Sequence, residues 1–390
     1  MEINDFLTPI NPGDFSSDKF LSVDSFFSGV KTFNNSNSFP DLQDAKVALI
    51  GVDESRGANP SYVAKGAADL IRQKLYSLKK HSSRINFFDL GNLLPGHKVN
   101  DTSIALTTIL TELYRLNIIP IIIGGSQDLT FAHYQAFKQL DQIINIVGID
   151  SKFDLGVPSD ALSSSTYLGK IILDQPNYLF NYSQLAYQTY LVGQTSVDMM
   201  TNLYFDVYRL GIVSSEIKEC EPIIRNADII SFDISSIRQS DAPASSDPSP
   251  NGLYGEQACQ LMQYAGMSDK MCGLGLYEYN PVTDSSGQTA SLIAQMIWYF
   301  VEGILNRKKD LPESNPNSFT IYRSTINEGK QTLNFLKSNK TGRWWMELPL
   351  QETKKKLTRH HFIPCSHSDY LTACNNEIPE RWWQALQKIS

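Results

Sequence analysis

Short runs of apolar residues recur along the chain, and the segments between them carry apolar residues three and four positions apart. The runs are KVALIGV (46–52), IIPIIIGG (118–125), INIVGID (144–150), TYLVGQ (189–194), DIISFDI (228–234) and CGLGLYEYN (272–280), with INFFDLG (85–91) a weaker candidate. Continuous apolar runs are typical of strands in a parallel sheet, because helices cover both of its faces. The pattern therefore predicts a mainly parallel sheet.

Two of the intervening segments have strong helical periodicity. They are AADLIRQKLYSLKK (67–80) and TASLIAQMIWYFVEGIL (289–305). Strand and helix signals that alternate along a chain favour an α/β fold. SFTIYRS (318–324) is a further candidate strand, which lies beyond the last of these helices.

Composition narrows the class of protein. The 390 residues are 42% hydrophobic, and the net charge of −7 argues against a nucleic-acid binder. The five cysteines have no close pairs, which indicates free thiols in a reducing compartment. No apolar run approaches the ~18 residues that a membrane span needs, and the N-terminal residues lack a signal pattern. We expect a cytoplasmic protein without membrane insertion.

Polar residues follow the ends of several predicted strands. Gln127, Asp150, Asp154, Asp233 and Glu278 all take such positions. In an open α/β sheet the ligand crevice lies outside the carboxyl ends of the strands, so these side chains are expected at one edge. The alternative is that each is an ordinary turn or cap residue.

Seven motifs follow one another in the order of a known family. They are GVDESRGANPSYVAKGAADLIRQKL (51–75), FDLGN (88–92), GGSQD (124–128), DSKFD (150–154), SFDIS (231–235), NGLYGEQA (251–258) and EYNPVTDSSGQTA (278–290). Together they resemble the ureohydrolase family of arginase, agmatinase and formimidoylglutamase. The resemblance implies a three-layer α/β fold with a mainly parallel central sheet. It places an arginase-like domain at 46–305, between an N-terminal extension (1–45) and a C-terminal extension (306–390).

The resemblance also implies two manganese ions held by two histidines and four aspartates. Three aspartates are retained, whereas the other ligand positions are replaced. The retained residues are Asp150, Asp154 and Asp233. Gln127 and Lys152 stand at the two histidine positions and Ser235 at the fourth aspartate position. Ser126 replaces the aspartate before the first histidine, and Leu168 lies near the position of a further catalytic histidine. With so few ligands we expect no bound metal, no cofactor and no catalytic residue.

A residual pocket is nevertheless expected. Its residues are Gln127, Asp150, Lys152, Asp154, Asp233, Ser235, Glu278 and Asn280. We expect the Lys152 ammonium to lie among the three retained aspartates and to replace the lost metal charge, although desolvation offsets much of that gain. Glu278 and Asn280 keep the family's substrate-facing pattern, which permits a cationic or amidino ligand.

Three functional hypotheses follow. The leading one is a pseudoenzyme that binds a partner protein or a ligand. The alternative is an active amidinohydrolase of the formimidoylglutamase type, with a single manganese ion on Asp150, Asp154 and Asp233, assisted by Gln127 or Asp128. The third is a structural subunit with an inert pocket.

The resemblance also implies a homo-oligomer. The C-terminal extension carries four of the five tryptophans, in RWWMELPL (343–350) and PERWWQALQKI (379–389). Aromatic segments of this kind either pack on the core or anchor a protein partner. The basic run KKKLTRHH (354–361) is interpreted as solvated surface.

Overall fold

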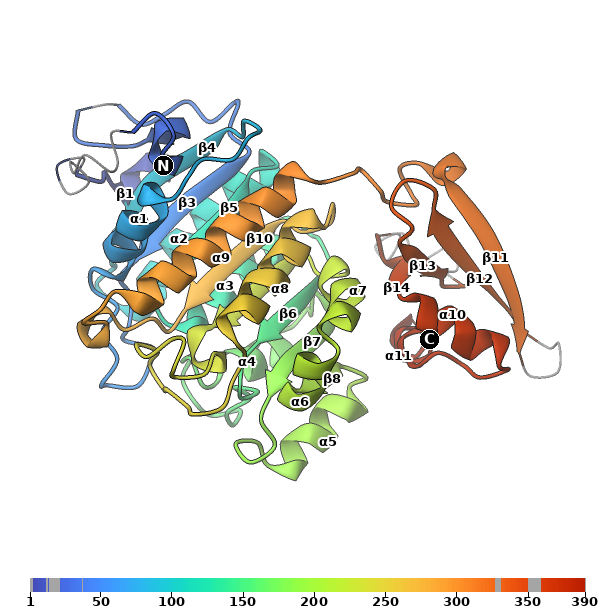
Figure 1. Ribbon diagram of the computed structural model, residues 1–390. Helices are drawn as coiled ribbons and strands as arrows, with labels where there is room; N and C mark the ends of the chain where they lie inside the picture. The colour runs from blue at the N-terminus through green and yellow to red at the C-terminus, as the bar shows by residue number, and fades with distance from the viewer. Residues whose placement is uncertain are drawn as a thin grey trace.

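A ten-stranded sheet forms the centre of the protein in the computed structural model, which describes residues 3–11, 13, 22–36, 38–326, 331–349 and 359–389 (Figure 1). The strands lie in the order β1 (Leu7–Thr8), β4 (Phe87–Leu93), β3 (Val47–Val52), β5 (Ile119–Ile123), β10 (Gly273–Tyr277), β9 (Ile229–Asp233), β6 (Ile144–Ile149), β7 (Leu179–Tyr187) and β8 (Asp206–Arg209), and β2 (Val30–Thr32) also pairs with β4. All pairings are parallel except that of β1 with β4.

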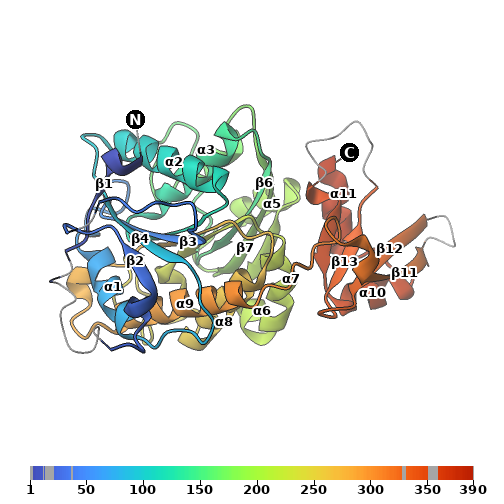
Figure 2. The ribbon, with the colours of Figure 1, turned by 90° about the horizontal axis from the view of Figure 1, so that it is seen from above.

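Helices cover both faces of this sheet (Figure 2). One layer contains α1 (Ala67–Ser77), α6 (Leu210–Ser215), α7 (Cys220–Arg225), α8 (Gly255–Met267) and α9 (Gln288–Leu305); the other contains α2 (Val99–Arg115), α3 (Thr130–Gln139), α4 (Tyr167–Leu173) and α5 (Gln194–Asn202). In β3, Val47 and Leu49 pack toward the first layer, whereas Ala48 and Ile50 pack toward the second. Successive strand residues point to opposite faces, so a strand covered on both sides must be apolar throughout. The expected three-layer α/β fold is confirmed.

One predicted strand is wrong. TYLVGQ (189–194) lies in the turn after β7 and the start of α5, and the strand itself is Leu179–Tyr187. Polar residues interrupt the apolar pattern of that strand, yet they are buried because they have partners. The Ser183 hydroxyl donates to Asp206 (2.7 Å), and the Gln184 amide donates to the carbonyl of Asp150 (2.9 Å).

The C-terminal residues form a separate small unit. Its antiparallel sheet contains β11 (Phe319–Ile326), β12 (Gln331–Ser338), β13 (Trp344–Glu347) and β14 (Phe362–Cys365), and α10 (His367–Cys374) and α11 (Glu380–Ile389) follow. The strand expected at 318–324 is thus confirmed as β11. This unit has its own apolar core, which includes Phe335, Trp344 and Trp382.

The C-terminal unit packs beside α7, at the amino ends of the parallel strands (Figures 1 and 2). The Arg225 guanidinium lies 4.1 Å from the centre of the Trp345 ring and donates to the carbonyl of Trp344 (3.2 Å). Arg359 forms an ion pair with Asp228, directly before β9 (2.6 Å). Arg359 itself stays exposed, as the solvated interpretation of 354–361 expects. That interpretation is wrong for His360, which is buried, and residues 354–358 lie outside the described residues.

In the part of the chain that the structure describes, no helix is both long and apolar enough to cross a membrane.

A buried histidine makes stability depend on pH. His133 in α3 is 2% exposed, and burial lowers the pKa of its imidazole to about 3, from 6.5. Between these values the unfolded chain binds a proton that the folded chain does not. The free energy of unfolding should therefore fall as the pH drops below 6.5, by up to ~1.4 kcal/mol per pH unit for this group.

The variant His133→Asn tests this expectation, because it keeps a polar side chain for Tyr114 (2.6 Å from Nδ1) but cannot titrate. Urea unfolding followed by far-UV circular dichroism at several pH values should give a smaller pH slope for the variant. Equal slopes would contradict the assignment.

Candidate functional site

The sheet brings the predicted polar residues together. Strands β5, β10, β9 and β6 are consecutive neighbours, and Gln127, Glu278, Asp233 and Asp150 lie at or just past their carboxyl ends. Asp154 follows in the loop after β6. The five residues proposed from strand ends therefore converge at one edge, opposite the edge that the C-terminal unit contacts.

Two glycines form the turn that delivers Gln127. Gly124 and Gly125 have φ of +82° and +78°, in the left-handed region that favours glycine. A Cβ on Gly124 would lie 2.8 Å from the carbonyl oxygen of Val52 in the neighbouring strand β3. The turn directs the Gln127 backbone N–H to Oε1 of Glu278 (2.9 Å), so it positions two of the site residues at once.

The Gln127 carboxamide lies between two carboxyl groups and two hydroxyl groups. We assign its orientation so that the amide nitrogen donates to Asp150 and Asp154 (3.2 Å each), because only then do both ends have suitable partners. Its oxygen then accepts from Ser231 (3.1 Å) and Tyr167 (3.2 Å). Gln127 is 1% exposed, so this network fixes the side chain at the base of the site.

Four carboxyl groups share this edge. Burial raises the pKa of Asp154 well above its usual range, and the neighbouring Asp150 charge and its hydrogen bond to Asp154 add to the shift. Burial, with the charges of Asp150 and Glu278, raises the pKa of Asp233 in the same direction. Burial also raises the pKa of Glu278 to about 7. Such a group of acids favours a bound cation or retained protons.

Backbone strain accompanies two of these acids. Asp154 has φ +51° and Glu278 has φ +66°, which side chains other than glycine rarely adopt. Conformations of this kind persist where the surrounding structure enforces them, and they concentrate at functional sites. The strand ends therefore hold both carboxyl groups at a conformational cost.

Lys152 does not lie among the retained aspartates, so that expectation is wrong. Its ammonium forms an ion pair with Asp247 (2.5 Å), and both side chains are largely exposed at 43% and 66%. An ammonium among the buried carboxyl groups would lose its hydration, whereas the exposed pair with Asp247 keeps it. The Gln127 amide, rather than the Lys152 ammonium, contacts the carboxyl groups of Asp150 and Asp154, although the Lys152 backbone N–H donates to Asp150 (3.1 Å).

Other predicted positions have structural roles. The Asn280 side chain accepts from the N–H of Val282 (3.2 Å) and so caps a short turn of helix. Ser235 is buried and donates its backbone N–H to Asp233 (2.6 Å). Leu168 is fully buried in the apolar core beside α3.

Sequence reasoning missed two tyrosines. Tyr167 reaches Gln127, and its hydroxyl lies 3.1 Å from that of Tyr182. Tyr182 in turn donates to Gln184 (3.0 Å), whose amide donates to the carbonyls of Asp150 and Lys152. Neither tyrosine follows the end of a predicted strand, so the sequence pattern did not select them. Tyr167 could have been found only because it precedes Leu168, the residue near the position of the family's further catalytic histidine.

These residues do not fit the two-manganese centre that the resemblance implies. The Gln127 orientation that satisfies both ends presents N–H donors, not lone pairs, to Asp150 and Asp154. Among the described residues, no three His, Cys, Asp or Glu side chains are arranged to hold one metal ion. Metal ligands must offer lone pairs, so the amide and the Ser235 backbone N–H compete with a cation for the carboxylate oxygens.

Comparisons with known proteins agree with the fold. The chain is 24% identical over 296 residues to a formimidoylglutamase of Streptococcus gordonii (69% of this chain, 87% of that protein) and 26% identical over 267 residues to one of Staphylococcus aureus (66% and 86%). Among solved structures it resembles formiminoglutamase from Trypanosoma cruzi with manganese, with a TM-score of 0.64, 18% identity and coverage of 70% and 97%.

These relatives correct the leading functional hypothesis. They match two thirds of the chain, and both curated relatives are named as enzymes. The expectation of a pseudoenzyme, which rested on counting lost metal ligands, is wrong, and the alternative of an active amidinohydrolase is favoured instead.

The family assignment rests on a separate match. The model of the arginase family matches residues 45–302, which is most of the chain and includes every strand end of the site. The chain therefore belongs to the arginase family.

Proposed function

We propose that this chain hydrolyses a linear amidine of the formimidoylglutamate type through its altered acidic site. The observation that carries the proposal is the convergence of four carboxyl groups, Asp150, Asp154, Asp233 and Glu278, at the carboxyl edge of the sheet. An amidinium is a planar cation with several N–H donors, so it matches carboxylates in charge and geometry. The names of the relatives support the same substrate class.

The residues of this chain supply binding and proton transfer. Glu278 and Asp233 hold the amidinium, and the Asp150–Asp154 pair accepts a proton from water. The water oxygen adds to the amidine carbon, one carbon–nitrogen bond breaks, and the departing nitrogen takes up the proton. The products of formimidoylglutamate are then formamide and glutamate. Burial raises the pKa of both Asp150 and Asp154, and a raised pKa makes a carboxylate a better proton acceptor.

Quantification of the reaction products tests this proposal. Purified protein is incubated with formimidoylglutamate and a panel of guanidino compounds, with and without manganese, and formamide, urea and amine products are quantified. Asp154→Asn removes one member of the proton-accepting pair, and Asp198→Asn, on the exposed face of α5, is the matched control. We expect turnover by the wild type and the control only. Absence of turnover, or equal turnover by Asp154→Asn, would overturn the proposal.

We also predict that the wild-type site does not retain manganese and that restoring ligands creates a metal site. In the triple variant Gln127→His, Lys152→His and Ser235→Asp, imidazoles replace two hydrogen-bond donors and a carboxylate replaces a poor metal ligand. Elemental mass spectrometry, after expression with manganese and purification without chelators, should find far less than one ion per wild-type chain. The variant should bind manganese stoichiometrically. A full ion in the wild type would contradict this prediction.

A further inference from the structure

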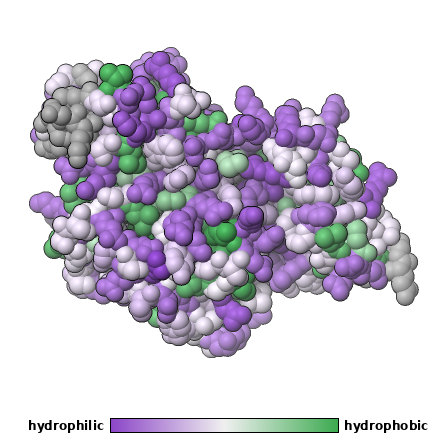
Figure 3. Space-filling view, in the orientation of Figure 1, coloured by the Kyte–Doolittle hydropathy of each residue, from purple (hydrophilic) through white to green (hydrophobic). Residues whose placement is uncertain are grey.

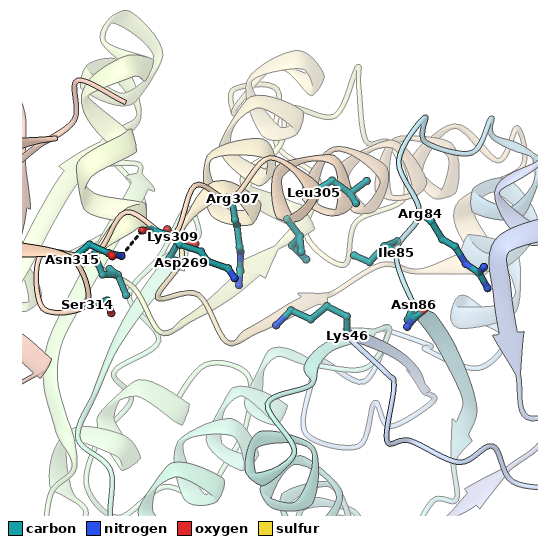
Figure 4. A pocket seen from close by; sticks show the side chains of 12 residues that line it. Lys46, Arg84, Ile85, Asn86, Asp269, Leu305, Arg307, Lys309, Ser314 and Asn315 are labelled. Atoms are coloured by element: carbon teal, nitrogen blue, oxygen red, sulfur yellow. Dashed lines mark hydrogen bonds between the residues drawn. The ribbon is translucent and has the colours of Figure 1, made fainter. Parts of the chain in front are cut away.

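A second hollow lies at the opposite edge of the sheet from the acidic site. Its volume is ≈ 740 Å³, within the range typical of small-molecule sites. Lys46 and Asn86 line it directly before β3 and β4, and the segment after α9, which leads to the C-terminal unit, closes its other side. Figure 4 shows Lys46 and Arg307 directed toward the same space, whereas Arg84 points away.

The lining is strongly cationic. It includes Lys46, Arg84, Arg307 and Lys309, against one acidic residue, Asp269. Among the described residues, none of these four cations has a carboxylate within ion-pair distance. Partial desolvation and the charges of Arg307 and Lys309 lower the pKa of Lys46, against a smaller opposing effect of Asp269, so the cations repel one another there. Such repulsion is relieved by an anion.

Hydrogen bonds fix the guanidinium of Arg307 and the backbone of the segment that carries Lys309. The Arg307 guanidinium donates to the carbonyls of Gly266 and Met271 (2.9 Å each), which are neutral acceptors. Asn315 donates to the carbonyl of Lys309 (3.1 Å), the bond drawn in Figure 4, so the connecting segment is fixed where it faces the hollow. A preorganised site of this kind loses little entropy on binding.

Apolar side chains complete the wall. Ile85, Ile304, Leu305 and Leu311 line the hollow beside the cations. Cations that are spread over several elements suit a ligand with more than one anionic group, and the apolar wall suits a carbon body. We propose that this hollow binds a small organic anion with two or more phosphate or carboxylate groups. The acidic site repels such a compound, so the two sites take ligands of opposite charge.

Titration calorimetry at fixed ionic strength tests the proposal, with pyrophosphate and citrate as probes of the phosphate and carboxylate sources. Lys46→Gln and Lys309→Gln each remove one cation, and both residues are exposed, so the fold should tolerate the changes. Lys65→Gln, at an exposed position outside the hollow, is the control with the same change in net charge. We expect at least one probe to bind the wild type with a Kd below about 1 mM.

Each hollow variant should weaken that binding by about tenfold, the usual order for one charge-assisted hydrogen bond. The Lys65→Gln control should bind as the wild type does. Stronger binding of pyrophosphate would assign the ligand to phosphates, and stronger binding of citrate would assign it to carboxylates. Binding of neither probe, or equal binding by the hollow variants and the control, would overturn the proposal. The cations that line the hollow would then be solvated by water and would hold no ligand.

Discussion

Glu278→Gln is expected to lower kcat/KM for a linear amidine by about a hundredfold or more. Loss of one partner from a desolvated charge pair typically costs 2–5 kcal/mol, roughly 30-fold to several thousandfold. The substitution is a sharp test because glutamine retains the Oε1 acceptor for the Gln127 N–H and the same backbone strain at φ +66°. Only the charge that faces the amidinium is lost.

The measurement is steady-state kinetics with the best substrate of the panel, alongside thermal unfolding of each protein. Glu256→Gln, at an exposed position in the first turn of α8, is the control and should leave kcat/KM within about twofold. If Glu278→Gln also retained wild-type kcat/KM while folding normally, Glu278 would not hold the substrate. The acidic edge would then need a different assignment.

The sequence located the acidic edge because two independent signals coincide there. Strands β6 and β9 are mostly apolar, so a polar residue at the end of each stands out: Asp150 follows β6 and Asp233 ends β9. Parallel topology then brings those residues to one edge without any knowledge of strand order. The convergence of Gln127, Asp150, Asp154, Asp233 and Glu278 was predictable for this reason.

Side-chain direction was not predictable in the same way. Position in the DSKFD motif placed Lys152 at the pocket, but its long side chain reaches outward to Asp247, nearly a hundred residues away. Tyr167 enters the network from α4, which carries no strand-end signal. The strand β7 was missed because its polar residues are satisfied by partners distant in sequence, such as Asp206.

The error about function has a related cause. The replacements at Gln127, Lys152 and Ser235 show how far this site differs from the two-manganese centre of the family. They do not show what the remaining carboxyl groups can bind. The retained acids remain together at one edge of the sheet, where burial raises their pKa values and favours a bound cation or retained protons. The curated relatives that match this chain are named as enzymes, and their names favour the hydrolase hypothesis over the count of lost ligands.

Arg72→Met should produce the largest loss of stability in the arginase-like domain. The Arg72 guanidinium forms two hydrogen bonds with Asp89 (2.7 and 3.0 Å), and both side chains are fully buried. It also donates to the carbonyl of Gly91 (2.8 Å) and to Asn92 (2.6 Å), so one side chain joins α1 to β4. Methionine fills similar volume but leaves the Asp89 carboxylate buried without a cation, which typically costs 3–5 kcal/mol.

Urea unfolding followed by far-UV circular dichroism measures this loss. Tryptophan fluorescence would be less suitable, because four of the five tryptophans lie in the C-terminal unit and not in the arginase-like domain. Arg115→Met, in an exposed pair with Glu112, is the matched control and should change the free energy of unfolding by less than ~1 kcal/mol. The double variant Arg72→Met/Asp89→Leu should regain much of the lost stability, because it removes the unpaired charge as well as its partner. If the double variant were no more stable than Arg72→Met, the loss would come from packing around α1 and not from the stranded carboxylate.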